Sequence, residues 1–562
     1  MKQHRLRIGL LIDTYDIPQW AFRMVEEIHQ SHYARIVLLI KNDALRSTQQ
    51  TFFQKLKEHS QRILYIGLMK LEQQIFRITP DAFATQNISG LFSDLPCIHV
   101  RPQQKNFSDY LCREDIDTIK GYNLDVLVRL GFRILRGEIL HAAKYGVWSY
   151  HHGDSTVNRG GPAGFWEVFE GWKVTGSILQ ILTEDLDNGM VLCRSQSQTD
   201  RLSVIRGNNS RYWNALYFLP RKLEELYTLG EEAFFLRVHR ENQHPCFYSR
   251  RLYRTPTNLQ MLALALKHYS GYLLKKFTYL CSSYQWILLF RIHQHQGAST
   301  SLWRFKKMIP PKDRAWADPF VVLHGGSFYV FIEEFMNELN RAHISYFTID
   351  MHGKCSVPKQ IIQQPYHLSY PFVFMHNGTY YLIPESSENR SIELYQCVNF
   401  PEKWERVHVM MENVRAFDTT LFQRGGTWFL FTNMQVHAGT SSWDELFLFY
   451  STELFSGHWI PHPQNPVVSD VSSARPAGRV FLYNKHLYRP SQDSSHRYGY
   501  GIKINQILTL TESEYREVCV NHITPEWDKS IIATHTINFA DRLTVIDGLV
   551  QRSRFWRSGQ ES

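Results

Sequence analysis

The sequence predicts an α/β domain with a mainly parallel, Rossmann-like sheet, followed by an all-β domain, and three observations support this fold class. Apolar strand-like runs alternate with helical patterns up to about residue 200, and such alternation is typical of a parallel sheet. Beyond about residue 302, glycines, aromatic residues and short alternating strands recur instead. The 562 residues also exceed the roughly 250–300 at which a single core stops growing, so more than one domain is expected.

The predicted α/β domain covers residues 1–205. Its elements follow from the spacing of the apolar residues. Helices are predicted at 20–29 and 138–143, and strands at 8–12, 34–40, 63–66, 124–128, 147–150 and 177–182. The first strand leads into Ile12-Asp13-Thr14-Tyr15 rather than a GxGxxG turn, so a dinucleotide is not indicated.

A helical connector is predicted over residues 206–300, with long amphipathic stretches at 212–229 and 258–290. The apolar segment Phe277–Phe290 is flanked by Lys275, Lys276 and Arg291. At about 14 residues it is too short for the roughly 20 residues of a bilayer-spanning helix. Two interpretations fit: a packed linker helix, or an interfacial helix giving at most peripheral membrane contact through its flanking cations.

Residues 301–550 contain a repeated unit of strand, tight turn and strand. Four units have turns at Gly325-Gly326, Asn377-Gly378, Gly425-Gly426 and Asn484-Lys485, and a weaker fifth spans about 532–548. The units recur at intervals of about 45–60 residues, which is the period of a propeller blade. A five-bladed β-propeller is therefore predicted.

Charge and cysteine content exclude several classes of function. The net charge of +9 is spread thinly and no run of five or more Lys/Arg occurs, so no nucleic-acid partner is predicted. The eight cysteines form no CxxC pair, which argues against a zinc site or a disulfide framework. We therefore expect no metal, and a reducing, cytoplasmic location.

The strongest chemical signal lies between Gly146 and Leu192. A short strand leads to His151 and His152 in a polar loop, and a later strand-like run ends at Asp187. A His from one strand end and an Asp from the next turn can form a hydrogen-bonded pair, which suits proton transfer beside a reacting carbonyl. Ser149, two residues before His151 on the strand, is expected to point the same way.

This block resembles the folate-dependent formyltransferases. The resemblance rests on His151, Arg159-Gly160, Pro162, Thr175-Gly176 and Leu186-Asp187-Asn188-Gly189, with Ile134–Leu140 upstream. It implies formyl transfer from 10-formyltetrahydrofolate to an amine, with His151, Asp187 and Ser149 as catalytic residues. It further implies a donor pocket formed by Leu130, Gly131, Ile134, Leu135 and Asp187, and substrate contacts from His152, Asp154 and Arg159.

Ser149 departs from the family pattern, which has Asn at this position. A hydroxyl is shorter than an amide and offers one donor instead of two, and losing an oxyanion donor typically costs about 10²–10³ in rate. Three interpretations stay open: His152, Ser149 or a backbone amide takes over; the chemistry has shifted to another acyl or one-carbon group; or the domain only binds.

The β half resembles the propeller of glycoside hydrolase family 43 and, more closely, the N-terminal domain of plant glucosamine inositolphosphorylceramide transferases. The matching motifs are Trp316-Ala-Asp-Pro-Phe, His367-Leu-Ser-Tyr-Pro-Phe, Ile383-Pro-Glu-Ser-Ser, His462-Pro-Gln-Asn-Pro, Ala474-Arg-Pro-Ala-Gly, Tyr488-Arg-Pro-Ser-Gln-Asp and His535-Thr. The hydrolase resemblance makes Asp318 the base and Asp418 the pKa-tuning Asp. Arg475 lies where the acid Glu is expected.

A guanidinium cannot donate a proton near neutral pH, but it binds anions well. This half is therefore expected to bind an anionic sugar, a nucleotide-sugar or a glycolipid head group rather than to hydrolyse a sugar. The candidate binding residues are Asp318, Asp418, Arg475, Arg489, Gln492, Asp493 and His535. The simpler interpretation is that Asp318 and Asp418 only fix turns.

The sequence thus predicts an enzyme that transfers a formyl group from a reduced folate to an amino group of a sugar or glycoconjugate, while the propeller binds the carbohydrate. The expected partner is an amino sugar, a nucleotide-sugar or a glycolipid head group. The alternative is a non-catalytic carbohydrate-binding or glycosyl-transfer accessory protein with a degenerate transfer domain.

Overall fold

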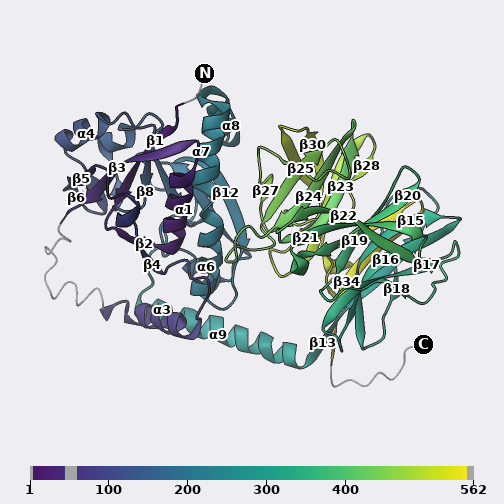
Figure 1. The fold of residues 1–562 in the computed structure, drawn as a ribbon. Helices are drawn as coiled ribbons and strands as arrows, with labels where there is room; N and C mark the ends of the chain where they lie inside the picture. Colours follow the sequence, from purple (N-terminus) through teal and green to yellow (C-terminus); the bar gives the residue numbers. More distant parts are fainter. Residues whose placement is uncertain (1–3, 45–59, 554–562) are drawn as a thin grey trace. The chain divides into compact units, whose positions relative to one another are not determined.

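The computed structural model describes residues 4–44 and 60–553. The chain forms two compact units: unit 1 comprises Met1–Tyr272 with His437–Thr440, and unit 2 comprises Leu273–Val436 with Ser441–Ser562 (Figure 1). Residues 206–272, which the sequence assigned to a separate connector, thus cluster with unit 1.

Unit 1 contains a seven-stranded mixed sheet in the order β12-β11-β10-β8-β1-β3-β5. Its strands are β1 (Leu6–Ile12), β3 (Ala34–Asn42), β5 (Cys97–Val100), β8 (Val126–Arg129), β10 (Val147–His151), β11 (Val174–Ile181) and β12 (Met190–Gln198). The five strands from β10 to β5 pair in parallel, whereas β11 and β12 pair antiparallel. The predicted α/β class is therefore confirmed.

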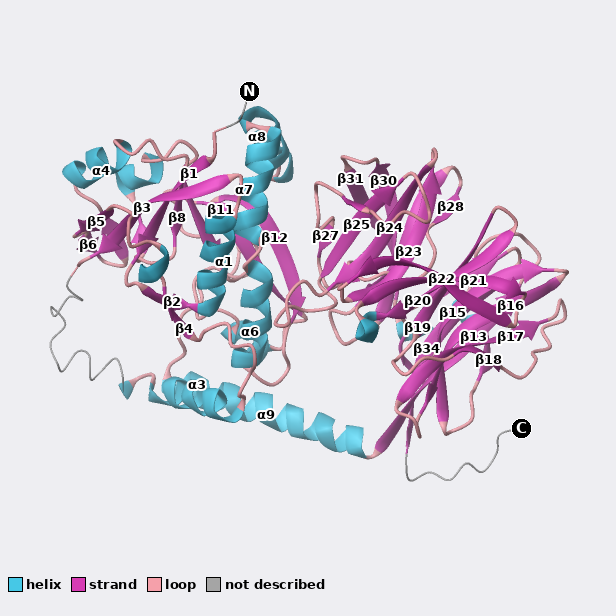
Figure 2. Ribbon diagram, viewed as in Figure 1, coloured by secondary structure: helices cyan, strands magenta, loops and turns pink. Residues whose placement is uncertain are grey.

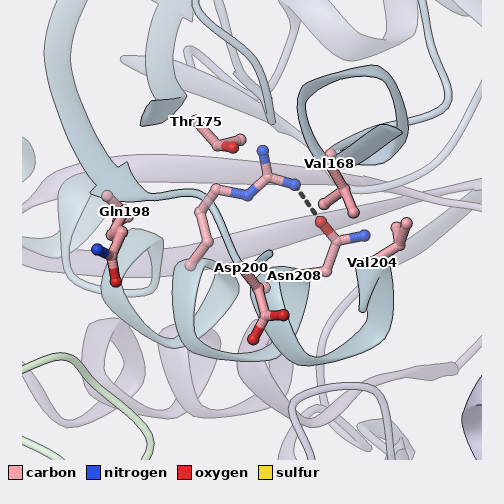
Figure 3. A pocket seen from close by; sticks show the side chains of 10 residues that line it. Val168, Thr175, Gln198, Asp200, Val204 and Asn208 are labelled. Atoms are coloured by element: carbon pink, nitrogen blue, oxygen red, sulfur yellow. Dashed lines mark hydrogen bonds between the residues drawn. The ribbon is translucent and has the colours of Figure 1, made fainter. Parts of the chain in front are cut away.

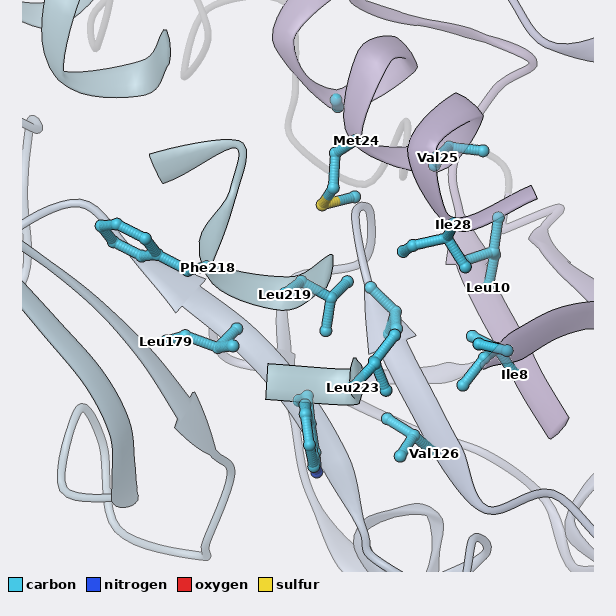
Figure 4. Close-up of a cluster of buried hydrophobic side chains, with 14 of the residues drawn as sticks. Ile8, Leu10, Met24, Val25, Ile28, Val126, Leu179, Phe218, Leu219 and Leu223 are labelled. Carbon is cyan, nitrogen blue, oxygen red and sulfur yellow. The ribbon is translucent and has the colours of Figure 1, made fainter. Parts of the chain in front are cut away.

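Apolar side chains cover both faces of this sheet. On one face, Ile8 and Leu10 pack with α1 (Gln19–Gln30) and α7 (Phe218–Leu229), as Figure 4 shows. On the other, Leu11 packs with α4 (Arg113–Lys120). Burial on both faces explains why the strands read as nearly continuous apolar runs.

The remaining elements of unit 1 are short or peripheral (Figure 2). They are β2 (Asp16–Pro18), β4 (Thr85–Asn87), η1 (Ser89–Leu91), β6 (Gln103–Lys105), β7 (Ser108–Tyr110), β9 (Ile134–Leu135), η2 (Gly137–His141), α5 (Phe165–Glu170), α6 (Val204–Ala215) and α8 (Glu231–Glu241). The predicted helical stretch 212–229 is divided between α6 and α7.

The predicted strand at 63–66 is wrong, because these residues begin the helix α3 (Ile63–Ile75). Tyr65, Leu68 and Met69 of α3 pack together against a buried cluster of unit 1. Their spacing of three and four residues fits one helix face, and the short run 63–66 was too brief to show that period.

The prediction of a helix over Phe277–Phe290 is also wrong for the second half of this segment. Helix α9 (Asn258–Leu280) ends before β13 (Ser282–Ile292). Along its 11 residues β13 pairs with β34 (Leu543–Ser553), and its apolar residues alternate between two buried clusters. Within the described residues, no helix has the length and apolarity needed to span a bilayer.

Among its described residues, unit 2 forms five antiparallel sheets. The first contains β15 (Arg314–His324), β16 (Ser327–Met336), β17 (Arg341–Ile349) and β18 (Lys359–Ile362), and the second contains β19 (Ser369–His376), β20 (Thr379–Ser386), β21 (Ser391–Asn399) and β22 (Lys403–Glu412). The third contains β23 (Ala416–Arg424), β24 (Thr427–Met434), β25 (Glu445–Ser451), β26 (Ile460–Pro461) and β27 (Val468–Ser469). The fourth contains β28 (Phe481–Tyr483), β29 (His486–Asp493), β30 (Gly501–Leu510) and β31 (Tyr515–Ile523).

The fifth sheet joins the two ends of unit 2. In it, β13 and β14 (Lys306–Met308) pair with the C-terminal strands β32 (Ile531–Ala533), β33 (Ile537–Ala540) and β34. The four predicted turns lie between the first two strands of the other sheets, so the all-β class and its repeated unit are confirmed.

Candidate functional sites

The first candidate site lies where strands of the unit 1 sheet end. Arg129 is the last residue of β8, Ser149 and His151 lie on β10, and Asp187 lies in the loop between β11 and β12. We call these four residues the strand-end cluster. The carboxyl ends of parallel strands are the usual position of α/β sites.

The structure brings His151 and Asp187 together. His151 Nδ1 lies 3.5 Å from Asp187 Oδ1, and both side chains are mostly buried. His151 Nε2 lies 3.0 Å from the carbonyl oxygen of Asn158. Both ring nitrogens thus face oxygen acceptors, and the Asp187 carboxylate is positioned to orient the ring.

Arg129 is a member of the cluster that sequence reasoning missed. Its Nη1 donates to Ser149 Oγ at 3.1 Å, while Nε and Nη2 donate to the carbonyl oxygens of Arg133 and Phe132. Burial lowers the pKa of Arg129, and Asp187 partly opposes this. The only signal in the sequence was a charged residue directly after the apolar run 124–128.

The Arg159-Gly160 motif meets the loop that carries Asp187. Gly160 N donates to the second Asp187 oxygen at 3.1 Å, and Arg159 Nη2 donates to Asn188 Oδ1 at 2.9 Å. Gly160 has φ +99, and a Cβ there would lie 2.2 Å from the carbonyl oxygen of Tyr253. The position therefore requires glycine.

His152 and Asp154 lie apart from His151. The His152 ring stacks on Tyr212 with centroids 3.5 Å apart and meets Trp20 edge-on. Burial and the nearby Arg211 lower its pKa well below the ordinary value, so this ring is neutral. Asp154 accepts hydrogen bonds from Thr156 within its own loop and from Arg194 at 2.6 Å. The contact with Thr156 caps the loop.

Five residues are expected to form the donor pocket, and the four besides Asp187 are buried to different degrees. Leu130 and Ile134 are half-buried, whereas Leu135 is buried in the core beside α4. Gly131 approaches Asp13 so closely that a Cβ would lie 2.5 Å from the Asp13 amide nitrogen. These placements do not test folate binding, which stays a prediction.

A pocket lies in the loop region that follows β10. Its volume of about 90 Å³ is lined by Asp154, Glu167, Trp172, Gln196 and three neighbouring residues. Glu167 is 1% exposed, and its Oε2 has no hydrogen-bond partner in the structure. Asn158 donates from Nδ2 to Glu167 Oε1 at 2.7 Å while its carbonyl faces His151. The pocket and His151 are thus linked through one residue.

A second, much smaller hollow of about 10 Å³ lies beside Arg211 and is lined by Thr175, Asp200 and Asn208 among others (Figure 3). Arg211 is 2% exposed, and it donates to the carbonyl oxygens of His152 and Gly176 and to Asn208 Oδ1. Through these contacts the Arg211 guanidinium connects the loop after β10, strand β11 and helix α6.

The second candidate site, in unit 2, includes the start of the first strand of three of the sheets. In β15, β19 and β23 the pairing register shifts at the same point, and there Asp318, Tyr370 and Asp418 adopt φ of +49, +44 and +52. Left-handed backbone costs a non-glycine residue roughly 1–2 kcal/mol. Such strain persists mostly at functional positions.

Four buried carboxylates gather at this point with two cations. We call Asp318, Glu385, Asp418, Asp547, Arg475 and His535 the carboxylate cluster. Arg475 contacts Asp418 at 2.5 Å and Glu385 at 3.1 Å, and Gln492 donates to Asp418 at 2.8 Å. His535 contacts Asp547 at 2.5 Å and lies 3.7 Å from Asp318.

The carboxylate cluster contains more acidic than basic groups, since four carboxyl groups face two cations. Burial raises the pKa of Asp318 to about 8, and burial together with Asp418 raises that of Glu385 to about 8. Burial would lower the pKa of His535, but Asp547 and Asp318 outweigh it and raise it to about 9. At neutral pH the cluster therefore holds protons on carboxyl groups, and a neutral carboxyl can donate a hydrogen bond.

Two sequence candidates do not join the cluster, and two members were missed. Arg489 pairs with Glu517 at 2.6 Å, and Asp493 pairs with His522 at 3.0 Å. Glu385 lies within the matched motif Ile383-Pro-Glu but was not singled out as a candidate. Asp547 carried no signal, because it lies within an ordinary strand pattern.

Asp318, His535 and Asp547 could also hold a metal ion, since their ligand atoms lie within 4.8 Å of one another. However, Asp318 Oδ1 accepts from Thr536 Oγ1 at 2.5 Å, and Asp547 Oδ1 accepts from the His535 and Thr536 amides. Hydrogen bonds and the His535 ion pairs thus account for this arrangement.

Aromatic rings surround the cluster. Trp286 stacks on His535 with centroids 4.2 Å apart, and Tyr498 meets the same ring edge-on at 5.5 Å. Arg475 lies over the Tyr498 ring at 5.1 Å. Trp286 and Tyr498 are half-buried, so the site combines aromatic surfaces with a few polar groups, as small-molecule sites usually do.

The raised pKa values predict that the stability of unit 2 falls between about pH 5 and pH 9. A group whose folded pKa is raised stabilises fully below its unfolded pKa and loses that contribution as pH passes the folded value. Glu385, which rises from 4.5 to about 8, should lose it across this window. Glu385→Gln cannot titrate, so the urea midpoint of this variant should fall less steeply with pH than that of wild type.

The matched control is Glu402→Gln, an exposed carboxylate paired with Lys359. The Lys359 ammonium lowers the pKa of Glu402, so this variant should follow the wild-type slope over the same range. Parallel profiles for wild type and Glu385→Gln would show that Glu385 is ionised throughout.

Comparison with known proteins relates most of unit 2 to one family. Residues 310–541 match the family model described as "Glucosamine inositolphosphorylceramide transferase 1, N-terminal". Curated relatives of that name are 34% identical over 208 residues in rice (Oryza sativa subsp. japonica) and 35% identical over 216 residues in Arabidopsis thaliana. The matches cover 36% of this chain but only 28% and 26% of the two relatives. They confirm the predicted resemblance of this half.

Two solved structures each overlap with part of the chain. A family 117 glycoside hydrolase, Zg3597 from Zobellia galactanivorans, overlaps 47% of this chain and 90% of its own, with a TM-score of 0.32 and 9% identity. Glycinamide ribonucleotide transformylase 1 from Symbiobacterium toebii overlaps 42% of this chain and 89% of its own, with a TM-score of 0.24 and 16% identity.

Proposed function

We propose that this protein is an enzyme of glycoconjugate metabolism in which unit 1 transfers a formyl group to the amino group of a sugar and unit 2 binds a sugar. The observation that carries the proposal is the contact of His151 with Asp187 beside Arg129 and Ser149. The name of the matched relatives includes glucosamine, an amino sugar, and a transferase activity. An amino sugar offers the nitrogen that formyl transfer requires.

The residues of the strand-end cluster divide the chemical tasks. Attack by an amine on a formyl carbon creates negative charge on oxygen and releases a proton from nitrogen. His151, oriented by Asp187, would accept that proton. Arg129 has five N–H donors, and three hydrogen bonds from them are described above. It would therefore supply the charge stabilisation that Ser149, in place of the family's Asn, cannot supply alone.

The residues present fit 10-formyltetrahydrofolate as the formyl donor. The half-buried Leu130 and Ile134 leave apolar surface close along the chain to Arg129. When bound, 10-formyltetrahydrofolate supplies the formyl group. The acceptor amine would enter the pocket of Asp154 and Glu167, because the unpartnered Glu167 Oε2 is suited to bind an ammonium or amine N–H.

The carboxylate cluster of unit 2 supports a sugar ligand rather than a strongly anionic one. Arg475 already contacts Asp418 and Glu385, so its charge is committed within the cluster. Carboxyl groups beside Trp286 and Tyr498 suit hydroxyl or amino groups of a sugar. A closed five-bladed arrangement of the sheets, which we also propose, would gather the first strands of all five around this site.

The test is calorimetric titration of 5-formyltetrahydrofolate into the full chain. Saturable binding is expected, and Arg129→Met should weaken it by about tenfold to 100-fold, since a hydrogen bond to a charged group is worth about 1.5–3 kcal/mol. The matched control is Arg113→Met, an exposed arginine of α4, which should bind as wild type does.

An absence of folate binding by wild type would overturn formyl transfer. Retained binding of an amino sugar in that case would support the second candidate, a carbohydrate-binding accessory protein. The observation that favours this second candidate is the carbonyl of Asn158, which engages His151 Nε2 and would have to be displaced for the ring to act.

A further inference from the structure

Helix α9 has two apolar faces. On the inner face, Met261 is buried, and Leu264 and Ala265 pack on the cluster formed with α5. On the outer face, six large apolar residues are 51–80% exposed: Leu259, Leu262, Leu266, Leu273, Phe277 and Leu280. Their spacings of three, four and seven residues place them within about 60° around a helix that turns about 100° per residue. They form one outward row along nearly the whole helix.

Helix α3 adds a second exposed row beside the first turns of α9. The Asn258 amide donates to the carbonyl oxygen of Gln61 at 2.8 Å, and Asn258 Oδ1 accepts from the Leu64 amide at 3.1 Å. Farther along, Glu72 of α3 lies close enough to Tyr269 of α9 to add to the rise in the pKa of Tyr269 that burial causes. The two helices therefore run side by side in the same direction (Figure 1).

Three of the exposed residues of α3 are also large and apolar. Ile63, Leu71 and Ile75 are 50–62% exposed. Together with the six residues of α9 they form what we call the outer face. An exposed apolar area of this extent on a folded protein usually marks an interaction site.

The exposed charges of α9 and α3 have one sign. Helix α9 carries Lys267, Lys275 and Lys276 and no Asp or Glu, and α3 carries Lys70. The one acidic residue of α3, Glu72, is 2% exposed and accepts from Ser203 Oγ at 2.7 Å. Across these two helices the exposed charge is therefore entirely cationic.

We propose that the outer face docks on the surface of an anionic lipid bilayer, with α9 lying in the plane of the head groups. Its apolar row would enter the boundary between head groups and acyl chains, while the lysines meet lipid phosphates. Two copies of this chain facing each other would bring their lysines together, which disfavours self-association. The exposed apolar row lies on α9 itself and ends at Leu280, so the strand half of Phe277–Phe290 takes no part.

The experiment is sedimentation of the full chain with phosphatidylcholine vesicles, with and without phosphatidylserine. Wild type should bind the vesicles that contain phosphatidylserine at least about tenfold more tightly, because each lysine near such a surface contributes about 1 kcal/mol, or roughly fivefold. The double variant Leu266→Glu/Phe277→Glu should lose at least about tenfold. The triple variant Lys267→Gln/Lys275→Gln/Lys276→Gln should lose the preference for phosphatidylserine.

The matched control is Leu482→Glu/Leu508→Glu, two exposed leucines of β28 and β30, which should bind within about twofold of wild type. Glutamate is a good helix former, so unchanged circular dichroism is expected for the α9 variants. Failure of wild type to bind, or wild-type binding by Leu266→Glu/Phe277→Glu, would overturn the proposal. A wild-type dimer that this variant converts to a monomer would assign the face to a second copy instead.

Discussion

Asp187→Asn should lower formyl transfer by about 10³–10⁴-fold while leaving the protein folded. An amide in place of the carboxylate can hold the His151 ring in the wrong tautomer and cannot stabilise its charged form. Asn tolerates the left-handed backbone that Asp187 adopts, with φ +50. The measurement is tetrahydrofolate release from 10-formyltetrahydrofolate in the presence of a panel of amino sugars.

The matched control for this prediction is Asp185→Asn, two residues earlier in the same loop and exposed, which should retain the wild-type rate. His151→Ala should fall as far as Asp187→Asn, because the two residues act as a unit. A folded Asp187→Asn variant that releases tetrahydrofolate at the wild-type rate would remove His151 and Asp187 from the mechanism.

Arg475→Met should destabilise unit 2 by about 3–5 kcal/mol, because it leaves Asp418 and Glu385 buried without their shared cation. Burial lowers the pKa of Arg475, but Asp418, Tyr498 and Glu385 together outweigh burial and raise this pKa well above its ordinary value, so the guanidinium is charged at every accessible pH. The measurement is urea unfolding followed by tryptophan fluorescence.

The control for Arg475→Met is Arg424→Met, at an exposed arginine of β23, which should change stability by no more than about 0.5 kcal/mol. Adding Asp418→Asn to Arg475→Met should recover part of the loss, because it removes the carboxylate that Arg475 contacts most closely. A loss below about 1 kcal/mol for Arg475→Met would show that water reaches the carboxylate cluster.

These two experiments probe different units, so their outcomes are separable. A chain that fails to release tetrahydrofolate but loses stability with Arg475→Met retains an intact carboxylate cluster. The sugar-binding part of the proposed function then stands without formyl transfer.

Local patterns in the sequence were sufficient to predict the two fold classes, the repeated unit of unit 2 and the contact between His151 and Asp187. Each of these depends on residues close together in the chain or on strand ends that a parallel sheet places at one edge. The glycine-containing turns of the repeats also lie where the sequence predicted them, because a tight turn depends on the conformation of only a few residues.

Long-range pairing decided the rest. The apolar run after Leu280 is a strand because it pairs with residues 543–553, about 260 positions away, and burial on both faces removes the alternation that would mark a strand. Arg129, Glu385 and Asp547 join their sites only because distant strands place them there. Their neighbours in the sequence carry no trace of the contacts that give Arg129 its hydroxyl partner or Glu385 its raised pKa.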